Sequence, residues 1–278
     1  FFRNNDAVKD LTNLSDNGNE VCFCTIGDAS TSEGHFWETM NAAGVLQVPL
    51  AVFVWDDGYG ISVPKKYQTT KASISEALKG LQKEDGTNGI HIYKLKGWDY
   101  AGMCEVLEHA IQSIRDTHTP ALFHVEEITQ PQGHSTSGSH ERYKSAERLE
   151  WEKEWDCIRK MRLWVIENGI ATNDELTLIE EKIKEAVKQS RNNAWEEYLK
   201  PIKQQAAAAV EVIKSTVVND IDHYNNLQKI AKELETNREP LRRDVMRSLS
   251  TAIDAAGNSP SAGRLNAHAP ALKEVNRL

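Results

Sequence analysis

The first half of the chain alternates short apolar runs with amphipathic stretches. Each run is rich in β-branched and aromatic residues and is bounded by turn-forming residues, which predicts a buried β-strand. The four runs are Val21 to Gly27, Pro49 to Trp55, Ile90 to Leu95 and Ala121 to Val125. Helices are expected between them at about 34–46, where Ser30 and Glu33 have the spacing of a capping box, and at about 99–115. This order predicts an α/β fold with a parallel sheet and right-handed crossovers.

The pattern becomes helical and charged after a polar loop. Residues 129–143 have no periodicity and predict an exposed loop. Helices are then expected at about 145–167, 173–199, 202–218, 221–236 and 240–256, with Pro201 separating the second helix from the third. The expected organisation is an α/β domain over residues 1–144, a helical extension over 145–236, and a helix and linker over 237–278.

Composition narrows the class of protein. Of the 278 residues, 40% are hydrophobic and 27% are charged, which is typical of a globular chain. No apolar run approaches the length of about 18 residues that a transmembrane helix needs. The net charge of −8 argues against broad binding to nucleic acid or to an anionic membrane. The four cysteines lack the spacing of a zinc site and suit a reducing compartment.

Two acids follow directly after predicted strands and are candidates for binding chemistry. Asp28 and Asp57 are 29 residues apart, which is the length of one strand–helix–strand unit. Ligands of parallel sheets bind beyond the carboxyl ends of the strands, so both carboxylates could face one crevice. Carboxylate oxygens suit Mg²⁺, and a helix beginning after Asp28 would direct its free N–H groups at an anion. Together these features suggest a bound diphosphate, although an acid at a strand end more often caps a turn.

The residues around both acids carry a resemblance to a known family. Gly27-Asp28-Ala29-Ser30 and Asp57-Gly58-Tyr59 resemble the two parts of the thiamine diphosphate motif. Ser32-Glu33-Gly34, Asn41-Ala42-Ala43 and Gly58-Tyr59-Gly60-Ile61-Ser62 resemble the alpha subunit of the decarboxylating component of 2-oxoacid dehydrogenase complexes. The loop Gly133-His134-Ser135-Thr136-Ser137 is most similar to that of the branched-chain (2-oxoisovalerate) type. The resemblance spans about residues 15–200.

The resemblance implies a transketolase-like fold that binds thiamine diphosphate and Mg²⁺. By position, the implied metal ligands are Asp28, Asp57 and the backbone carbonyl of Tyr59. The backbone N–H groups of Ala29 and Ser30 would contact the diphosphate. His134 would be the catalytic residue that faces the diphosphate and the reacting centre.

The resemblance also implies an activity and partners. The family decarboxylates a 2-oxoacid oxidatively and passes the acyl group to a lipoyl group on a transacylase component. A beta subunit or a fused beta moiety completes the site in a homo- or hetero-oligomer, and Leu241 to Ala256 would begin such a fused moiety. The chain would then be a fragment that is inactive alone. We expect it in the cytoplasm of a bacterium or in the mitochondrial matrix of a eukaryote, without nucleic-acid or membrane partners.

Three departures from the family pattern bear on this interpretation. Ala29 replaces a glycine, which requires a backbone conformation without positive φ. Asp56-Asp57 replaces Asn-Asn, so the added negative charge must be met by cations. Gln132 stands where the family often has histidine.

Other residues near this site have plainer interpretations, and two other functions fit the sequence. His124 is expected to be a satisfied core residue, Lys65-Lys66 a solvated pair, and the serines at 135, 137 and 139 a plain polar loop rather than phosphorylation sites. The alternatives that stay open are the alpha subunit of a pyruvate or acetoin dehydrogenase and, from another class, a non-catalytic α/β module for protein association.

Overall fold

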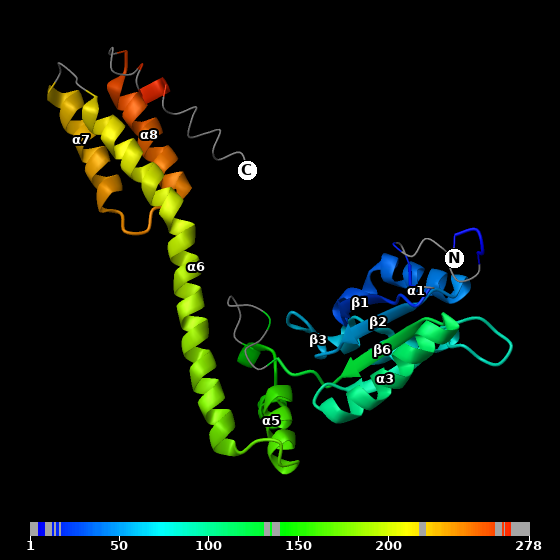
Figure 1. The fold of residues 1–278 in the computed structure, drawn as a ribbon. Helices are drawn as coiled ribbons and strands as arrows, with labels where there is room; N and C mark the ends of the chain where they lie inside the picture. Colours follow the sequence, from blue (N-terminus) through cyan, green and yellow to red (C-terminus); the bar gives the residue numbers. More distant parts are fainter. Residues whose placement is uncertain are drawn as a thin grey trace. The chain divides into compact units, whose positions relative to one another are not determined.

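The computed structural model of the chain describes residues 5–8, 13, 15–16, 18–130, 134, 140–216, 221–258, 263 and 265–267, without the side chains of 221 and 222 (Figure 1). The chain divides into two compact units, residues 1–173 and residues 174–278. The three regions expected from the sequence stay a prediction about domain organisation.

Among the described residues of the first unit, four parallel strands form a sheet in the order β1-β2-β6-β5. Their bounds are Cys22–Gly27 for β1, Leu50–Trp55 for β2, His91–Lys96 for β5 and Ala121–Glu126 for β6. Each lies within one residue of the predicted apolar run at both ends. The predicted α/β fold with a parallel sheet is therefore confirmed.

Helices cover the two faces of this sheet (Figure 1). On one face, α1 (Gly34–Leu46) and α2 (Ile74–Ala77) pack on Val52, Val54 and Leu122. On the other face, α3 (Tyr100–Thr117) packs on Ala51, Phe123 and Val125. Alternate residues of β2 and β6 thus enter opposite cores, as the period of a strand requires.

Strand β1 differs from its prediction as a buried strand. It lies at the edge of the described sheet, and most of its residues are exposed, including Phe23 at 55%. An apolar run predicts the strand itself, but burial also depends on which neighbours cover it.

A hairpin and several 3₁₀ turns lie outside the main sheet, and of these only the turn after Asp28 was expected from the sequence. A two-residue hairpin joins β3 (Tyr59–Gly60) to β4 (Val63–Pro64). The 3₁₀ turns are η1 (Ala29–Ser32), η2 (Lys65–Tyr67), η3 (Thr70–Ala72), η4 (Lys79–Leu81) and η5 (His140–Arg142). The expected capping box at Ser30 is wrong, because Ser30 lies inside η1 and Glu33 is the N-cap of α1.

The predicted helix at 145–167 is two helices. They are α4 (Ala146–Glu154) and α5 (Cys157–Glu167), and each begins with a side-chain cap. Ser145 accepts a hydrogen bond from the N–H of Arg148, and Asp156 accepts one from the N–H of Arg159. The cap at Asp156 explains the break between the helices.

In the part of the second unit that the structure describes, the long helices are α6 (Asn173–Ser215), α7 (Ile221–Thr236) and α8 (Arg242–Ala256). The expected separation at Pro201 is wrong, because α6 continues through it. A proline inside a helix costs about 3 kcal/mol, but the buried side chains of Leu199 and Ile202 flank it, and residues from 202 onward pack against α7 and α8. Across the part of the chain that the structure describes, no helix is both long and apolar enough to cross a membrane.

Candidate active site

The ends of β1 and β2 bring the predicted acids Asp28 and Asp57, together with Asp56, to one edge of the sheet. Gly27 pairs with Trp55, so Asp28 and Asp56 are the first residues beyond the two strands. The backbone fixes both positions, because the N–H of Asp28 donates to the carbonyl of Trp55 at 3.1 Å and the N–H of Asp56 donates to Val125 at 2.9 Å. The parallel arrangement thus places the acids where ligands of such sheets bind.

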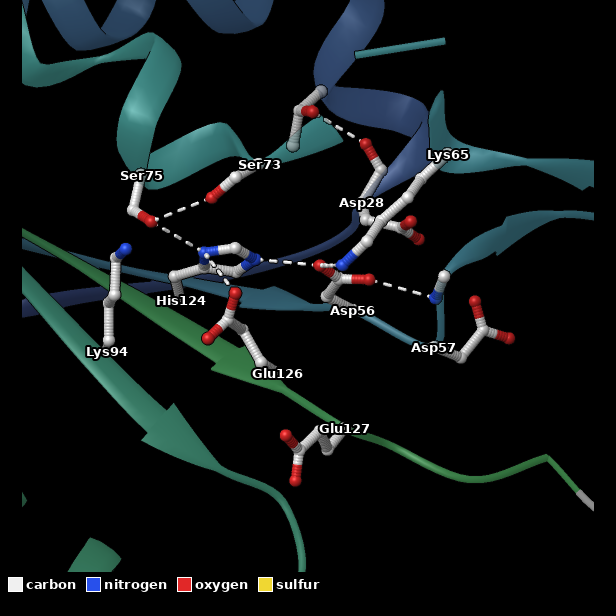
Figure 2. A network of polar contacts seen from close by, with 12 residues as sticks. Asp28, Asp56, Asp57, Lys65, Ser73, Ser75, Lys94, His124, Glu126 and Glu127 are labelled. Atoms are coloured by element: carbon white, nitrogen blue, oxygen red, sulfur yellow. Dashed lines mark hydrogen bonds and ion pairs between the residues drawn. The ribbon is translucent and has the colours of Figure 1, made fainter. Parts of the chain in front are cut away.

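A cavity of about 360 Å³ opens at this edge. Its lining includes all six residues that the sequence analysis named for the site: Asp28, Ala29, Ser30, Asp57, Tyr59 and His134. Trp55, Ile61 and Ile128 contribute apolar walls. The carboxylates of Asp28 and Asp57 point to the same side of the strand ends in Figure 2.

Asp28 is the acid whose buried carboxylate is not fully hydrogen-bonded by the part of the chain that the structure describes. Its side chain is 6% exposed, and its Oδ2 is the one buried side-chain atom without a hydrogen-bond partner among the described residues. Burial raises the pKa of Asp28 to about 7, and the neighbouring carboxylates of Asp56 and Asp57 add to the shift. A buried carboxylate oxygen without a donor is suited to a bound cation.

Asp57 is held by the tight turn that follows β2. Its Oδ1 accepts a hydrogen bond from the N–H of Tyr59 at 3.0 Å, and Gly58 between them has a φ of +84°. Burial raises the pKa of Asp57, and the Tyr59 N–H offsets only part of that rise. Arg148 donates to the backbone carbonyl of Asp57 at 2.9 Å, so the turn is also held from α4.

Asp56 is not among the residues that line the cavity, and both of its carboxylate oxygens have hydrogen-bond partners. Its Oδ2 accepts hydrogen bonds from Lys65 Nζ at 2.6 Å and from His124 Nε2 at 2.8 Å, and its Oδ1 accepts one from the N–H of Gly58 at 2.8 Å. Burial pushes the pKa of Asp56 upward, but the hydrogen bonds from His124 and Lys65 outweigh it and lower the pKa. The charge added by Asp56 is thus met inside this chain. Lys65 is therefore an ion-pair partner and not a member of a solvated pair.

His124 is a satisfied core residue, as predicted, but its partners were not foreseen. It is 0% exposed, and its two ring nitrogens hydrogen-bond Asp56 Oδ2 and, at 2.9 Å, Ser75 Oγ (Figure 2). The pairing of β2 with β6 sets His124 beside Val54, two residues before Asp56. A histidine inside an apolar strand was the available signal, but only the strand register reveals its partner.

A buried ion-pair cluster that the sequence analysis missed supports the turn from the other side. Lys144 Nζ contacts both carboxylate oxygens of Glu152 at 2.8 and 2.9 Å, and Arg148 Nε contacts Glu152 Oε1 at 2.8 Å. Lys144 also lies 5.2 Å from the ring centre of Tyr59. The cluster sets two cations close to the turn that carries Asp57 and Tyr59.

Ala29 fits its position despite the departure from glycine. It lies in η1 and is not among the residues with positive φ, so its methyl group causes no backbone strain. Space for that methyl comes from Gly60, where an added Cβ would lie only 2.8 Å from Ala29 Cβ.

His134 lines the cavity and is exposed. Burial raises the pKa of Tyr143, and a hydrogen bond with the backbone of His134 offsets part of that rise. The ring of Tyr143 lies 5.7 Å from that of Tyr59, so aromatic residues connect His134 with the turn. The expectations for Gln132 and for the serines at 135, 137 and 139 fall outside the described residues.

Comparison with known proteins gives a consistent family. Residues 8–203 match the family described as "Dehydrogenase E1 component". A pyruvate dehydrogenase E1 component subunit alpha from Rickettsia bellii is 28% identical over 172 residues, which are 62% of this chain and 50% of that protein. The mitochondrial 2-oxoisovalerate dehydrogenase subunit alpha 2 of Arabidopsis thaliana is 29% identical over 167 residues, which are 59% of this chain and 34% of that protein. The chain spans about half the length or less of these relatives.

Proposed function

Because the chain belongs to the dehydrogenase E1 component family, we propose that its strand-end cavity is the diphosphate and metal part of a thiamine diphosphate site. One observation carries this proposal: the six residues that the family resemblance selects line a single cavity, beside a buried oxygen of Asp28 that lacks a donor. The departures at Ala29 and Asp56 are compatible with such a site, because the first is unstrained and the second is neutralised.

In this proposal Mg²⁺ is held by Asp28, Asp57 and the carbonyl of Tyr59, a set of oxygen donors that suits this ion. Ala29 and Ser30 line the same cavity, and their N–H groups would face the diphosphate. Bound thiamine diphosphate would supply the electron sink that decarboxylation of a 2-oxoacid needs. His134 would contact the diphosphate and handle a proton at its imidazole near the reacting centre.

We further propose a branched-chain 2-oxoacid as the substrate. The support is the segment His134-Ser135-Thr136-Ser137 and the Arabidopsis relative, whereas the Rickettsia relative is named for pyruvate. Turnover of the intact enzyme with 2-oxoisovalerate, pyruvate and acetoin decides between these substrates. A preference for pyruvate or acetoin by kcat/KM would replace the branched-chain assignment.

Partners belong to the same proposal, because the chain covers only part of its relatives. A beta subunit or a fused beta moiety would complete the cofactor site, and a lipoyl-bearing transacylase component would accept the acyl group. Alone, the chain is expected to show no turnover of a 2-oxoacid with an artificial electron acceptor. Robust turnover by the chain alone would contradict that expectation.

Calorimetric titration of the intact protein with thiamine diphosphate, with and without Mg²⁺, tests the site. We expect binding that depends on Mg²⁺ and is lost in Asp28→Ala, because that variant removes the buried oxygen. Glu108→Gln, an exposed change on α3, is the matched control and should bind normally. Absence of metal-dependent binding in the unaltered protein would favour the association module instead.

A further inference from the structure

A chain of buried polar groups runs behind the candidate site and involves none of its six residues. Ser75 of α2 contacts His124 of β6, and His124 contacts Asp56 at the end of β2 (Figure 2). The three residues are 1%, 0% and 2% exposed. Ser75 in turn lies 3.2 Å from the hydroxyl of Ser73. Burying three polar side chains in an apolar core costs free energy unless each has a hydrogen-bond partner. These hydrogen bonds therefore restrict the positions of α2, β6 and the end of β2 relative to one another.

This series of hydrogen bonds leads, through Asp56, to the turn that carries the candidate metal ligands. Asp56 uses one carboxylate oxygen for His124 and Lys65, and the other for the N–H of Gly58. Gly58 is the residue between Asp57 and Tyr59. The orientation of the Asp56 carboxylate therefore fixes where the turn begins, and the orientation of His124 fixes the carboxylate.

The partners hold the ring from both sides. An ionised Asp56 only accepts, so the N–H at His124 Nε2 donates to it, while His124 Nδ1 lies 2.9 Å from the Ser75 hydroxyl and 3.8 Å from Glu126 Oε1. Ser75 thus contacts the ring at the nitrogen opposite the one that Asp56 uses. Hydrogen-bonding partners of this kind orient metal ligands in many proteins, and their loss typically weakens metal binding about 10- to 100-fold.

Resting on the proposed function, we infer that His124 and Ser75 are positioning residues for the Mg²⁺–diphosphate site and act through Asp56 on the turn of Asp57 and Tyr59. Their hydrogen bonds in the core allow a charged residue, rather than a neutral one, to stand at position 56. His124 and Asp56 should therefore behave as one unit, in which changing either residue alone is worse than changing both.

Two other roles for this cluster are less compatible with its geometry. Asp56, His124 and Glu126 have ligand atoms within 4.8 Å of one another, but the ammonium group of Lys65 already occupies Asp56 Oδ2. The order Ser75, His124, Asp56 is also that of a hydrolytic triad, but the hydroxyl of Ser75 is buried and offers no room for a substrate.

The test is a double-mutant cycle on the intact protein, read by Mn²⁺ binding in electron paramagnetic resonance and by thiamine diphosphate binding in calorimetry. His124→Leu leaves Asp56 buried with only Lys65 as its side-chain partner, and we expect affinity for both ligands to fall about 10- to 100-fold. In Asp56→Asn/His124→Leu no charge is left buried at position 56. The amide oxygen still accepts from Gly58, and the part-exposed Lys65 can turn to solvent. Affinity should then return to within about threefold of the unaltered protein.

Ser75→Ala keeps the test decisive if His124→Leu does not fold, because it removes one hydroxyl and should weaken binding severalfold in the same direction. His109→Gln, an exposed histidine on α3, is the matched control and should not change either affinity. Unchanged affinities in His124→Leu and Ser75→Ala, or additive losses in the double variant, would overturn the inference. If instead the unaltered protein bound neither ligand, the proposed function itself would fail.

Discussion

Three acids, Asp28, Asp56 and Asp57, lie close together at the ends of two neighbouring strands. They differ in how the negative charge of each carboxylate is stabilised. Asp56 is paired with Lys65 and His124, and Asp57 accepts from the N–H of Tyr59. Asp28 keeps one buried oxygen without a partner and has the pKa that rises to about 7. The electrostatic cost of the cluster is therefore concentrated at Asp28.

That cost predicts a pH-dependent stability. Because the folded pKa of Asp28 lies above its unfolded value of about 3.9, the folded chain holds a proton more tightly, and stability is lost as pH rises from about 4 to about 7. In chelator-treated protein, Asp28→Asn should raise the free energy of unfolding at pH 8 by up to about 4 kcal/mol and leave it unchanged near pH 3.5. Urea unfolding at both pH values measures this. A gain that is equal at both pH values would contradict the argument.

Asp57 leads to a second prediction at this scale. Asp57→Asn keeps an oxygen for the metal and an acceptor for the N–H of Tyr59, so Mg²⁺-dependent binding of thiamine diphosphate should persist within about tenfold. Asp57→Ala removes both and should abolish it. Calorimetry on the intact protein compares the two variants. Loss of binding in a folded Asp57→Asn would mean that Asp57 is not a ligand.

The sequence revealed the residues of the cavity but not those that support it. Asp28, Asp57 and Tyr59 belong to local motifs and could be named without any fold. His124 is 68 residues from Asp56, and Arg148 is 91 residues from Asp57, so both contacts depend on tertiary structure. No pattern along the chain encodes such pairs.

At the scale of elements, periodicity predicted the strands well and local rules failed at the helix ends. The apolar runs located every strand of the main sheet, because burial imposes that pattern directly. Ser30 is a residue type that caps helices, but it lies inside η1. Pro201 is a residue type that ends helices, but it lies within α6 between the buried side chains of Leu199 and Ile202. The hairpin of β3 and β4 is too short to carry any periodicity.

The contact between η1 and β3 gives a prediction for two elements together. Gly60→Ala would put a methyl group within 2.8 Å of Ala29 Cβ and against the flexible Gln68 side chain. We expect a loss of about 1–3 kcal/mol in unfolding free energy and weaker cofactor binding, because both walls of the cavity shift. Ala29→Gly in the same protein removes the methyl group that the new side chain at position 60 would contact, so it should recover most of the lost unfolding free energy. Additive effects of the two substitutions in thermal unfolding would show that the walls do not touch in this way.

At the scale of the whole molecule, the described hydrophobic cores fall into separate parts of the sequence. Two cores lie on either face of the sheet and draw on residues between 21 and 128, whereas a third lies among α6, α7 and α8 and draws on residues from 202 onward. Folding cooperativity follows shared buried contacts, so two units with separate cores should unfold as separate steps.

Matched core substitutions test this independence. Leu122 and Leu249 are both 0% exposed, one in the sheet core and one in the helical core. Leu122→Ala and Leu249→Ala should each cost about 2–5 kcal/mol, which corresponds to a shift on the order of 10 °C in one transition only. Hydrogen exchange followed by mass spectrometry, read along a thermal ramp, assigns each transition to its peptides. Leu249→Ala should accelerate exchange in α6 to α8 and leave β2 and β6 protected, and Leu122→Ala should do the reverse. If either substitution destabilised both sets of peptides equally, the two units would be one cooperative domain. A substitution in the helices would then also destabilise the cavity at the strand ends.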